Sequence, residues 1–263
     1  MTKPSYTIRL ILGFCFLLGC STLLAKQTLK GFALLQYESL QTIIEASLNG
    51  AGLEEFNKIT LRVANNIQWS NGKSTNRYIK AHRRCYPYLK RQSRDDMPAF
   101  LFLIAYLESG WRAKVGNPLH DYGYWQMTPE VVREIRKLPE ASKKLSRSSL
   151  KRIRNHKDLS TEAAFIHIHR YYFYFRHVAN FEEADAWMFT LVAFNWGAGN
   201  VKRMLIDMET EEKDLTFSAF YQYLVARSNN NEDDKSMRIA VEYIPNLWNI
   251  ALLLAGKTST LES

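Results

Sequence analysis

The amino-acid sequence predicts a mainly α-helical fold. Apolar residues recur at helical spacing over several long stretches, and no alternating strand segment of convincing length occurs. Few Asn-Gly or Asp-Gly hairpin signals interrupt this pattern. Of the 263 residues, 46% are apolar and 23% are charged, with 12 Gly and 7 Pro. These proportions are globular, so they exclude a disordered, collagen-like or low-complexity protein.

The first residues have the pattern of an export signal. Lys3 and Arg9 precede an unbroken weakly polar run, residues 10–25, whose 16 residues fall short of the roughly 20 that cross a bilayer. Within the run, Leu17-Leu18-Gly19-Cys20 resembles the lipobox of bacterial lipoproteins. This resemblance implies a signal peptide over residues 1–19 and a lipidated Cys20. We therefore expect a lipoprotein of the bacterial cell envelope, anchored to a membrane and facing the periplasm. An ordinary signal peptide and a short retained anchor helix are the alternatives.

Helices are expected along the rest of the chain. Ala33, Tyr37, Leu40, Ile44 and Leu48 recur at helical spacing until Asn49-Gly50, which has the composition of a helix end. A shorter helix follows over residues 53–69, and the polar residues 70–76 are a candidate domain boundary. Further helices are predicted over residues 100–107, 161–175, 184–194, 217–226 and 236–254.

The most apolar of these helices ends in a carboxylate. Residues 98–107 are apolar on every face, and a helix of that kind must be buried on every side. Pro98 suits its first turn, and Glu108 follows its last residue. Because burial disfavours a charged carboxylate, we expect a raised pKa for Glu108, as a general acid requires. The alternative is a glutamate that marks where the helix emerges into solvent.

Five motifs resemble, in order and spacing, those of lytic transglycosylases with a lysozyme-like fold. They are Glu108-Ser109-Gly110-Trp111, Gly123-Tyr124-Trp125-Gln126-Met127, residues 158–164, Ala193-Phe194-Asn195-Trp196-Gly197 and Glu242-Tyr243-Ile244-Pro245. The closest similarity is to the membrane-bound lytic murein transglycosylase D branch. It implies a helical catalytic domain with a substrate groove over residues 77–256, preceded by an N-terminal helical extension, residues 20–76, and followed by a tail, residues 257–263.

The resemblance also implies a reaction. Such enzymes cleave the β-1,4 bond between N-acetylmuramic acid and N-acetylglucosamine in peptidoglycan glycan strands, without a cofactor. One carboxylic acid protonates the leaving oxygen, and its carboxylate then takes the proton of the muramyl 6-hydroxyl, so that a 1,6-anhydromuramyl end forms. Glu108 matches the position of this acid.

Further residues match positions that line the sugar groove or orient the acid: Ser109, Gln126, Asn195 and Tyr243. Trp125 and Met127 are expected to offer apolar surface for stacking on a sugar. Helix or turn capping is the structural alternative for Gln126 and Asn195. Two departures from the family pattern bear on substrate detail. Phe194 stands where the family usually has tyrosine, and residues 116–122 replace its usual small-residue stretch.

Charge and cysteine content bear on partners and metals. The 35 Lys and Arg against 26 Asp and Glu give a net charge of +9, which favours a polyanionic partner. Export argues against nucleic acid. Ten of the cations lie from Arg133 to Lys157. They form either a solvated face or a surface that attracts the anionic stem peptides of the wall polymer. Three cysteines exclude a disulfide scaffold and a structural zinc site. The two rings of His167-Ile168-His169 point to different faces of a helix, so no metal is expected.

Two other functions stay open. A hydrolase like goose-type lysozyme would keep the fold but would need a carboxylate that positions water, for which Asp121 is the only nearby candidate. The second alternative is a catalytically idle wall-binding or assembly protein. The intact Glu108 argues against it, whereas Phe194 and the altered loop argue mildly for it.

Overall fold

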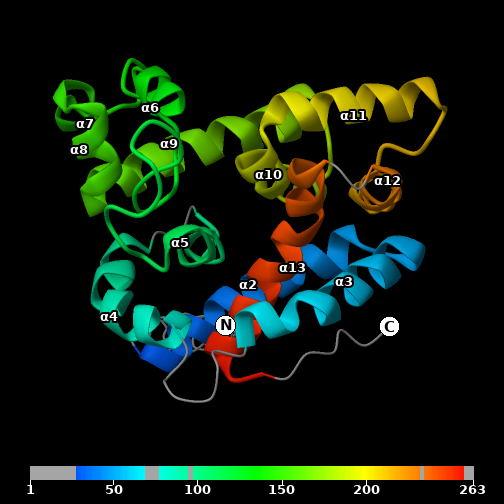
Figure 1. Ribbon diagram of the computed structural model, residues 1–263, viewed down its shortest axis with the longest axis horizontal. Helices are drawn as coiled ribbons and strands as arrows, with labels where there is room; N and C mark the ends of the chain where they lie inside the picture. Colours follow the sequence, from blue (N-terminus) through cyan, green and yellow to red (C-terminus); the bar gives the residue numbers. More distant parts are fainter. Residues whose placement is uncertain (1–27, 69–76, 94–96, 232–233, 258–263) are drawn as a thin grey trace, which may run out of the picture.

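The computed structural model describes residues 28–68, 77–93, 97–231 and 234–257. Within these residues the elements are helices without strands, so the predicted mainly α-helical class is confirmed (Figure 1). The helices are α2 Leu29–Ser47, α3 Gly50–Gln68, α4 Arg77–Gln92, α5 Leu101–Ser109, α6 Pro129–Ile135, α7 Lys143–Arg147, α8 Leu150–Asn155, α9 Lys157–Phe173, the π-helical turn η1 Tyr174–Val178, α10 Glu183–Trp196, α11 Ala198–Thr210, α12 Phe217–Asn230 and α13 Lys235–Ala255.

Every helix that the periodicity predicted is present. Their counterparts are α2, α3, α5, α9, α10, α12 and α13, with ends that differ by a few residues. The helix end predicted at Asn49-Gly50 lies within two residues of the observed one, because α2 ends at Ser47. The C-cap is Leu48, and Gly50 is already the first residue of α3. Pro98 is likewise not in a helical turn of α5. Its carbonyl accepts a hydrogen bond from the Leu101 N–H at 3.2 Å, in a turn that precedes the helix.

The C-terminal helix α13 is the centre of the packing. It contacts α2, α3, α4, α5, α10 and α12, and side chains of all these helices form one core cluster. The N-terminal helices α2 and α3 therefore share the core of the segment that follows them. The division into an N-terminal extension, residues 20–76, and a catalytic domain, residues 77–256, stays a prediction.

A proline inside α13 is tolerated because another residue takes over its missing hydrogen bond. Pro245 has no N–H, so the carbonyl of Val241 loses its helical partner. The Tyr221 hydroxyl, from α12, donates to that carbonyl at 2.9 Å. This contact keeps α13 continuous on either side of Tyr243, a predicted site residue.

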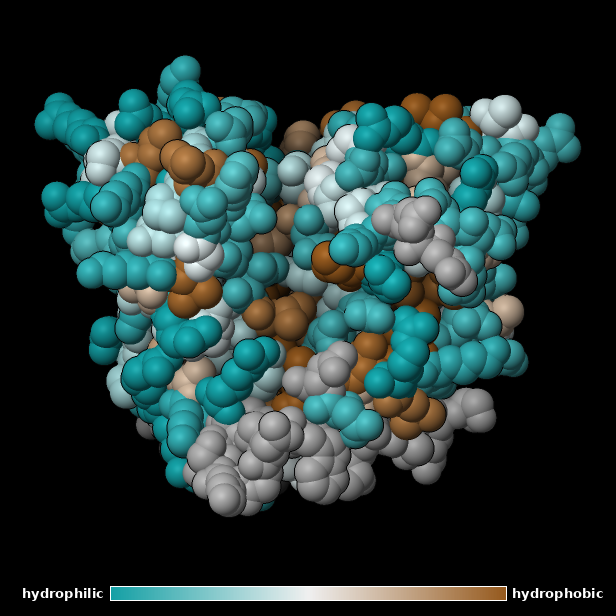
Figure 2. Space-filling view, viewed as in Figure 1, coloured by the Kyte–Doolittle hydropathy of each residue, from teal (hydrophilic) through white to brown (hydrophobic). Residues whose placement is uncertain are grey.

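Two lobes face each other across a hollow. In Figure 2 the surface is hollowed between the lobe of α6–α8 and the lobe of α10 and α11. The hollow agrees with the predicted substrate groove. Cys20, the signal peptide and the polar residues 70–76 lie outside the described residues. Among the helices that are described, none has the length and apolar character needed to cross a membrane.

Candidate active site

Glu108 lies in the last turn of the buried helix α5. The helix buries Leu101–Tyr106 and ends when Gly110 adopts a left-handed conformation, φ 61°. The Gly110 N–H donates back to the carbonyl of Tyr106 at 2.9 Å, and the Trp111 N–H donates to that of Ala105 at 3.1 Å. This tight end fixes the carboxylate where the most apolar helix stops.

Tyr243 contacts the acid directly. Its hydroxyl donates to Glu108 Oε1 at 2.8 Å, across 135 residues of sequence. Burial raises the pKa of Glu108, the Tyr243 hydrogen bond lowers it, and the nearby charge of Asp121 raises it. Together these effects move the pKa from its ordinary value of 4.5 to about 7. The predicted raised pKa is confirmed. At neutral pH a large part of this carboxyl is protonated and able to donate a proton.

Ser109 joins the acid to the second motif. Its hydroxyl donates to the carbonyl of Tyr124 at 2.7 Å and accepts a hydrogen bond from the Arg112 N–H at 3.2 Å. The side chain is buried. Ser109 therefore holds the 123–127 segment against the end of α5.

Gln126 braces the loop that differs from the family pattern. Its side-chain amide Nε2 donates to the carbonyls of Val115 at 2.9 Å and Gly123 at 2.6 Å. Its Oε1 lies so close to Gly116 that a Cβ there would come within 2.5 Å of it. The amide nitrogen is thus engaged by the protein itself. A contact of Gln126 with substrate stays a prediction.

Trp125 and Met127 do not offer a stacking surface. Trp125 is 0% and Met127 4% exposed. The indole N–H of Trp125 donates to Thr161 Oγ1 at 3.1 Å, and its rings contact Phe165 and Phe194. The expectation that these residues stack on a sugar is wrong, because no face of either side chain is free. Trp125 is a core residue that packs the second motif against α9 and α10.

Asn195 lies in the last turn of α10, half-buried. Its neighbour Phe194 contacts the Trp125 ring at 6.5 Å between centroids and the His167 ring at 6.0 Å. These contacts bring the motif of residues 193–197 beside the motif of residues 123–127. Phe194 fills an apolar space here, so the hydroxyl of the usual tyrosine has no counterpart.

Together, direct contacts connect Glu108 with Tyr243, Ser109 with the second motif, and the second motif with Phe194, next to Asn195. Residues 88–217 match the family model of the transglycosylase SLT domain. The match supports the predicted lytic transglycosylase and indicates activity on peptidoglycan. No curated protein matches the chain.

The SLT match ends before α13. Tyr243, whose hydroxyl donates to Glu108, therefore comes from a helix beyond the matched residues 88–217. The specific transglycosylase D branch stays a prediction.

Arg154, within the matched residues 88–217, has a structural role that the sequence did not indicate. This side chain is 3% exposed and donates to the carbonyls of His120 at 2.9 Å, Pro118 at 2.6 Å and Met127 at 3.4 Å. It thereby holds the loop that carries Asp121. In the sequence Arg154 is one cation of a basic run, and nothing in its spacing distinguishes it from exposed neighbours.

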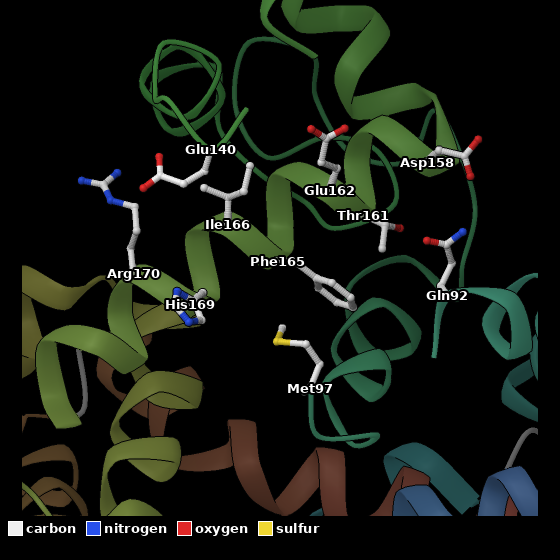
Figure 3. Close-up of a pocket in the computed structure, with 10 residues that line it drawn as sticks. All are labelled: Gln92, Met97, Glu140, Asp158, Thr161, Glu162, Phe165, Ile166, His169 and Arg170. Carbon is white, nitrogen blue, oxygen red and sulfur yellow. The ribbon is translucent and has the colours of Figure 1, made fainter. Parts of the chain in front are cut away.

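A cavity of about 580 Å³ is lined by residues that do not include Glu108 (Figure 3). It opens between α9 and Met97, before the start of α5, whereas Glu108 is at the end of that helix. His169 lines this cavity, whereas His167 contacts Phe194 on another side of α9. The two rings point to different faces, as predicted. In the described part of the chain no group of three His, Cys, Asp or Glu could hold a metal.

Proposed function

We propose that this protein cleaves the β-1,4 bond between N-acetylmuramic acid and N-acetylglucosamine of peptidoglycan without water, leaving 1,6-anhydromuramyl ends. The observation that supports this most is the Glu108 carboxyl. It is half-buried at the end of the apolar helix α5, has a pKa raised to about 7 and accepts a hydrogen bond from Tyr243. A carboxyl with a pKa near the working pH suits both donation and later acceptance of a proton.

The hydrogen bond of Tyr243 assigns different tasks to the two carboxyl oxygens. Oε1 accepts from Tyr243, while Oε2 has no hydrogen-bond partner among the described residues. Oε2 thus carries the transferable proton. It donates this proton to the glycosidic oxygen as the bond from that oxygen to the muramyl C1 breaks, and positive charge develops at C1.

The second step restores the acid. The Glu108 carboxylate takes the proton of the muramyl 6-hydroxyl, and the 6-oxygen forms the new bond to C1. No water is consumed and Glu108 ends protonated, so a second catalytic carboxylate is not required. Tyr243 and Ser109 act as positioning residues in this scheme, and Asn195 and Gln126 are proposed to face the sugars.

Hydrolysis, with Asp121 as the residue that activates water, is the second candidate function. Its charge contributes to the raised pKa of Glu108, so it lies within electrostatic reach of the acid. A water activated there would give ordinary reducing ends.

Mass spectrometry of muropeptides released from purified sacculi tests the proposal. Wild type is expected to release anhydromuramyl products. Glu108→Gln is expected to lose at least ~100-fold in rate, the scale of general acid catalysis, while the exposed control Glu140→Gln stays active. Asp121→Asn is expected to leave the products unchanged. Full activity of Glu108→Gln would overturn both readings of the site, and reducing ends that vanish in Asp121→Asn would favour hydrolysis.

We also propose that the protein is a lipoprotein of the cell envelope, anchored through Cys20. The lipobox-like residues 17–20 support this. Labelling of cells with a clickable fatty acid tests it, and label is expected on wild type but not on Cys20→Ala. Equal label on both would place the anchor elsewhere.

A further inference from the structure

A hollow of about 330 Å³, called here the Trp196 hollow, adjoins the motif of residues 193–197. It lies between the end of α10, the outer face of α11 and the start of α13. Trp196, which directly follows Asn195, forms its apolar wall together with Met237, and its polar rim consists of Asn200, Arg203, Asp207 and Asp234.

Hydrogen bonds fix the Trp196 indole in one orientation. Its Nε1–H donates to Ser236 Oγ at 3.2 Å, and the Ser236 hydroxyl donates in turn to Asp234 Oδ1 at 2.7 Å. The backbone of this residue is held as well, because Asn200 Nδ2 donates to the Trp196 carbonyl at 2.5 Å and Arg203 donates to Asn200 Oδ1. The indole is half-buried. It is therefore an ordered aromatic surface with a face open to the hollow.

The hollow lies on the same side of α13 as the acid. Ser236 and Tyr243 are seven residues apart on α13, which places them on one helix face about 10 Å apart along the axis. Ser236 contacts Trp196, and Tyr243 contacts Glu108. Because Trp196 directly follows Asn195, which is proposed to face the sugars, the hollow adjoins the proposed binding site of the strand.

The composition of the hollow matches one class of ligand. An aromatic surface packs against the apolar C–H face of a pyranose, and nearby amide, guanidinium and carboxylate groups can bond its hydroxyl and acetamido groups. Ile206, on the same rim, is 59% exposed and adds apolar surface. A lipid tail or an anion would bring no hydrogen-bond donor to the Asp207 carboxylate on the rim.

We propose that the Trp196 hollow is a distal glycan subsite, which binds a pyranose of the same strand away from the bond that Glu108 cleaves. This inference rests on the proposed function, because it assumes a glycan substrate. It assigns Trp196 a role in holding long strands rather than in the chemistry of cleavage.

Titration calorimetry with two probes tests the subsite. The full chain carrying Glu108→Gln is titrated with chitobiose, which is too short to span both places, and with chitohexaose. Trp196→Ala is expected to weaken chitohexaose binding by ~10-fold, the scale of one lost aromatic contact, and to leave chitobiose binding unchanged. Trp196→Phe should recover most of the affinity. Phe173→Ala, which removes an aromatic side chain that is 53% exposed on α9, is the matched control.

The outcomes separate this subsite from the proposed function. Unchanged chitohexaose affinity in Trp196→Ala would overturn the subsite, and so would an equal loss for both sugars, which would mean that Trp196 acts through Asn195. Asp207→Ala, on α11, checks the rim without touching the Asn195 turn and should weaken only chitohexaose. Absence of anhydromuramyl products from wild type would refute the proposed reaction while the length-dependent binding effect still supported the subsite.

Discussion

Replacing the acid is expected to stabilise the protein at high pH. The pKa of Glu108 is raised from 4.5 to about 7 by burial, so the folded state holds its proton over a pH range in which the unfolded chain has released it. Stability therefore falls as pH rises from about 4.5 to about 7, and the cost is complete above that range. Each pKa unit corresponds to about 1.4 kcal/mol, so the cost approaches about 3 kcal/mol.

Glu108→Gln removes this cost, because glutamine is neutral in both states and still accepts the Tyr243 hydrogen bond. At pH 8.5 the variant should unfold at a Tm roughly 6–12 °C above wild type, given the usual conversion for a chain of this size. At pH 4 the two should unfold together.

Thermal unfolding followed by circular dichroism at both pH values measures this difference. The exposed Glu140→Gln should match wild type throughout. An equal or lower Tm for Glu108→Gln at pH 8.5 would show that the carboxyl is not held in a desolvating site, and the reasoning from burial to a raised pKa would fail.

Two other predictions concern the residues that hold the acid and its loop. Tyr243→Phe removes the hydrogen bond that lowers the pKa of Glu108, so the descending limb of the profile of kcat/KM against pH should move to higher pH; a limb that stays in place or moves to lower pH would contradict the assigned bond. Arg154→Met leaves three loop carbonyls without their donor and should lower the free energy of unfolding by about 3 kcal/mol, measured by urea denaturation, whereas the exposed Arg152→Met should stay within about 0.5 kcal/mol of wild type; equal effects of the two would refute a bracing role for Arg154.

The long helices were predictable because each has enough apolar residues for its period to show. The helices α6, α7 and α8 have seven residues or fewer, too short for a repeat to be recognised. The missed α11 and α4 did carry a signal. In α11 the buried residues Val201, Met204, Leu205 and Met208 follow helical spacing, and in α4 a similar apolar face was obscured by the many cations around it.

The candidate site was predictable where its residues lie in family motifs. Motif order identified Glu108 and Tyr243, and the structure joins them by one hydrogen bond. The sequence could not show that Trp125 is buried on every side, because its burial depends on Phe165 and Phe194, which come from the distant helices α9 and α10. The bracing role of Arg154 depends on backbone carbonyls of another loop, and a sequence carries no mark of such contacts.

The central claim is that Glu108 acts as acid and then as base, without water. The most direct measurement is mass spectrometry of the cleavage products formed in water labelled with heavy oxygen. We predict anhydromuramyl products that contain no heavy oxygen and that are lost in Glu108→Gln. Products that carry one heavy oxygen at the muramyl C1 would contradict the claim and would show that the enzyme is a hydrolase.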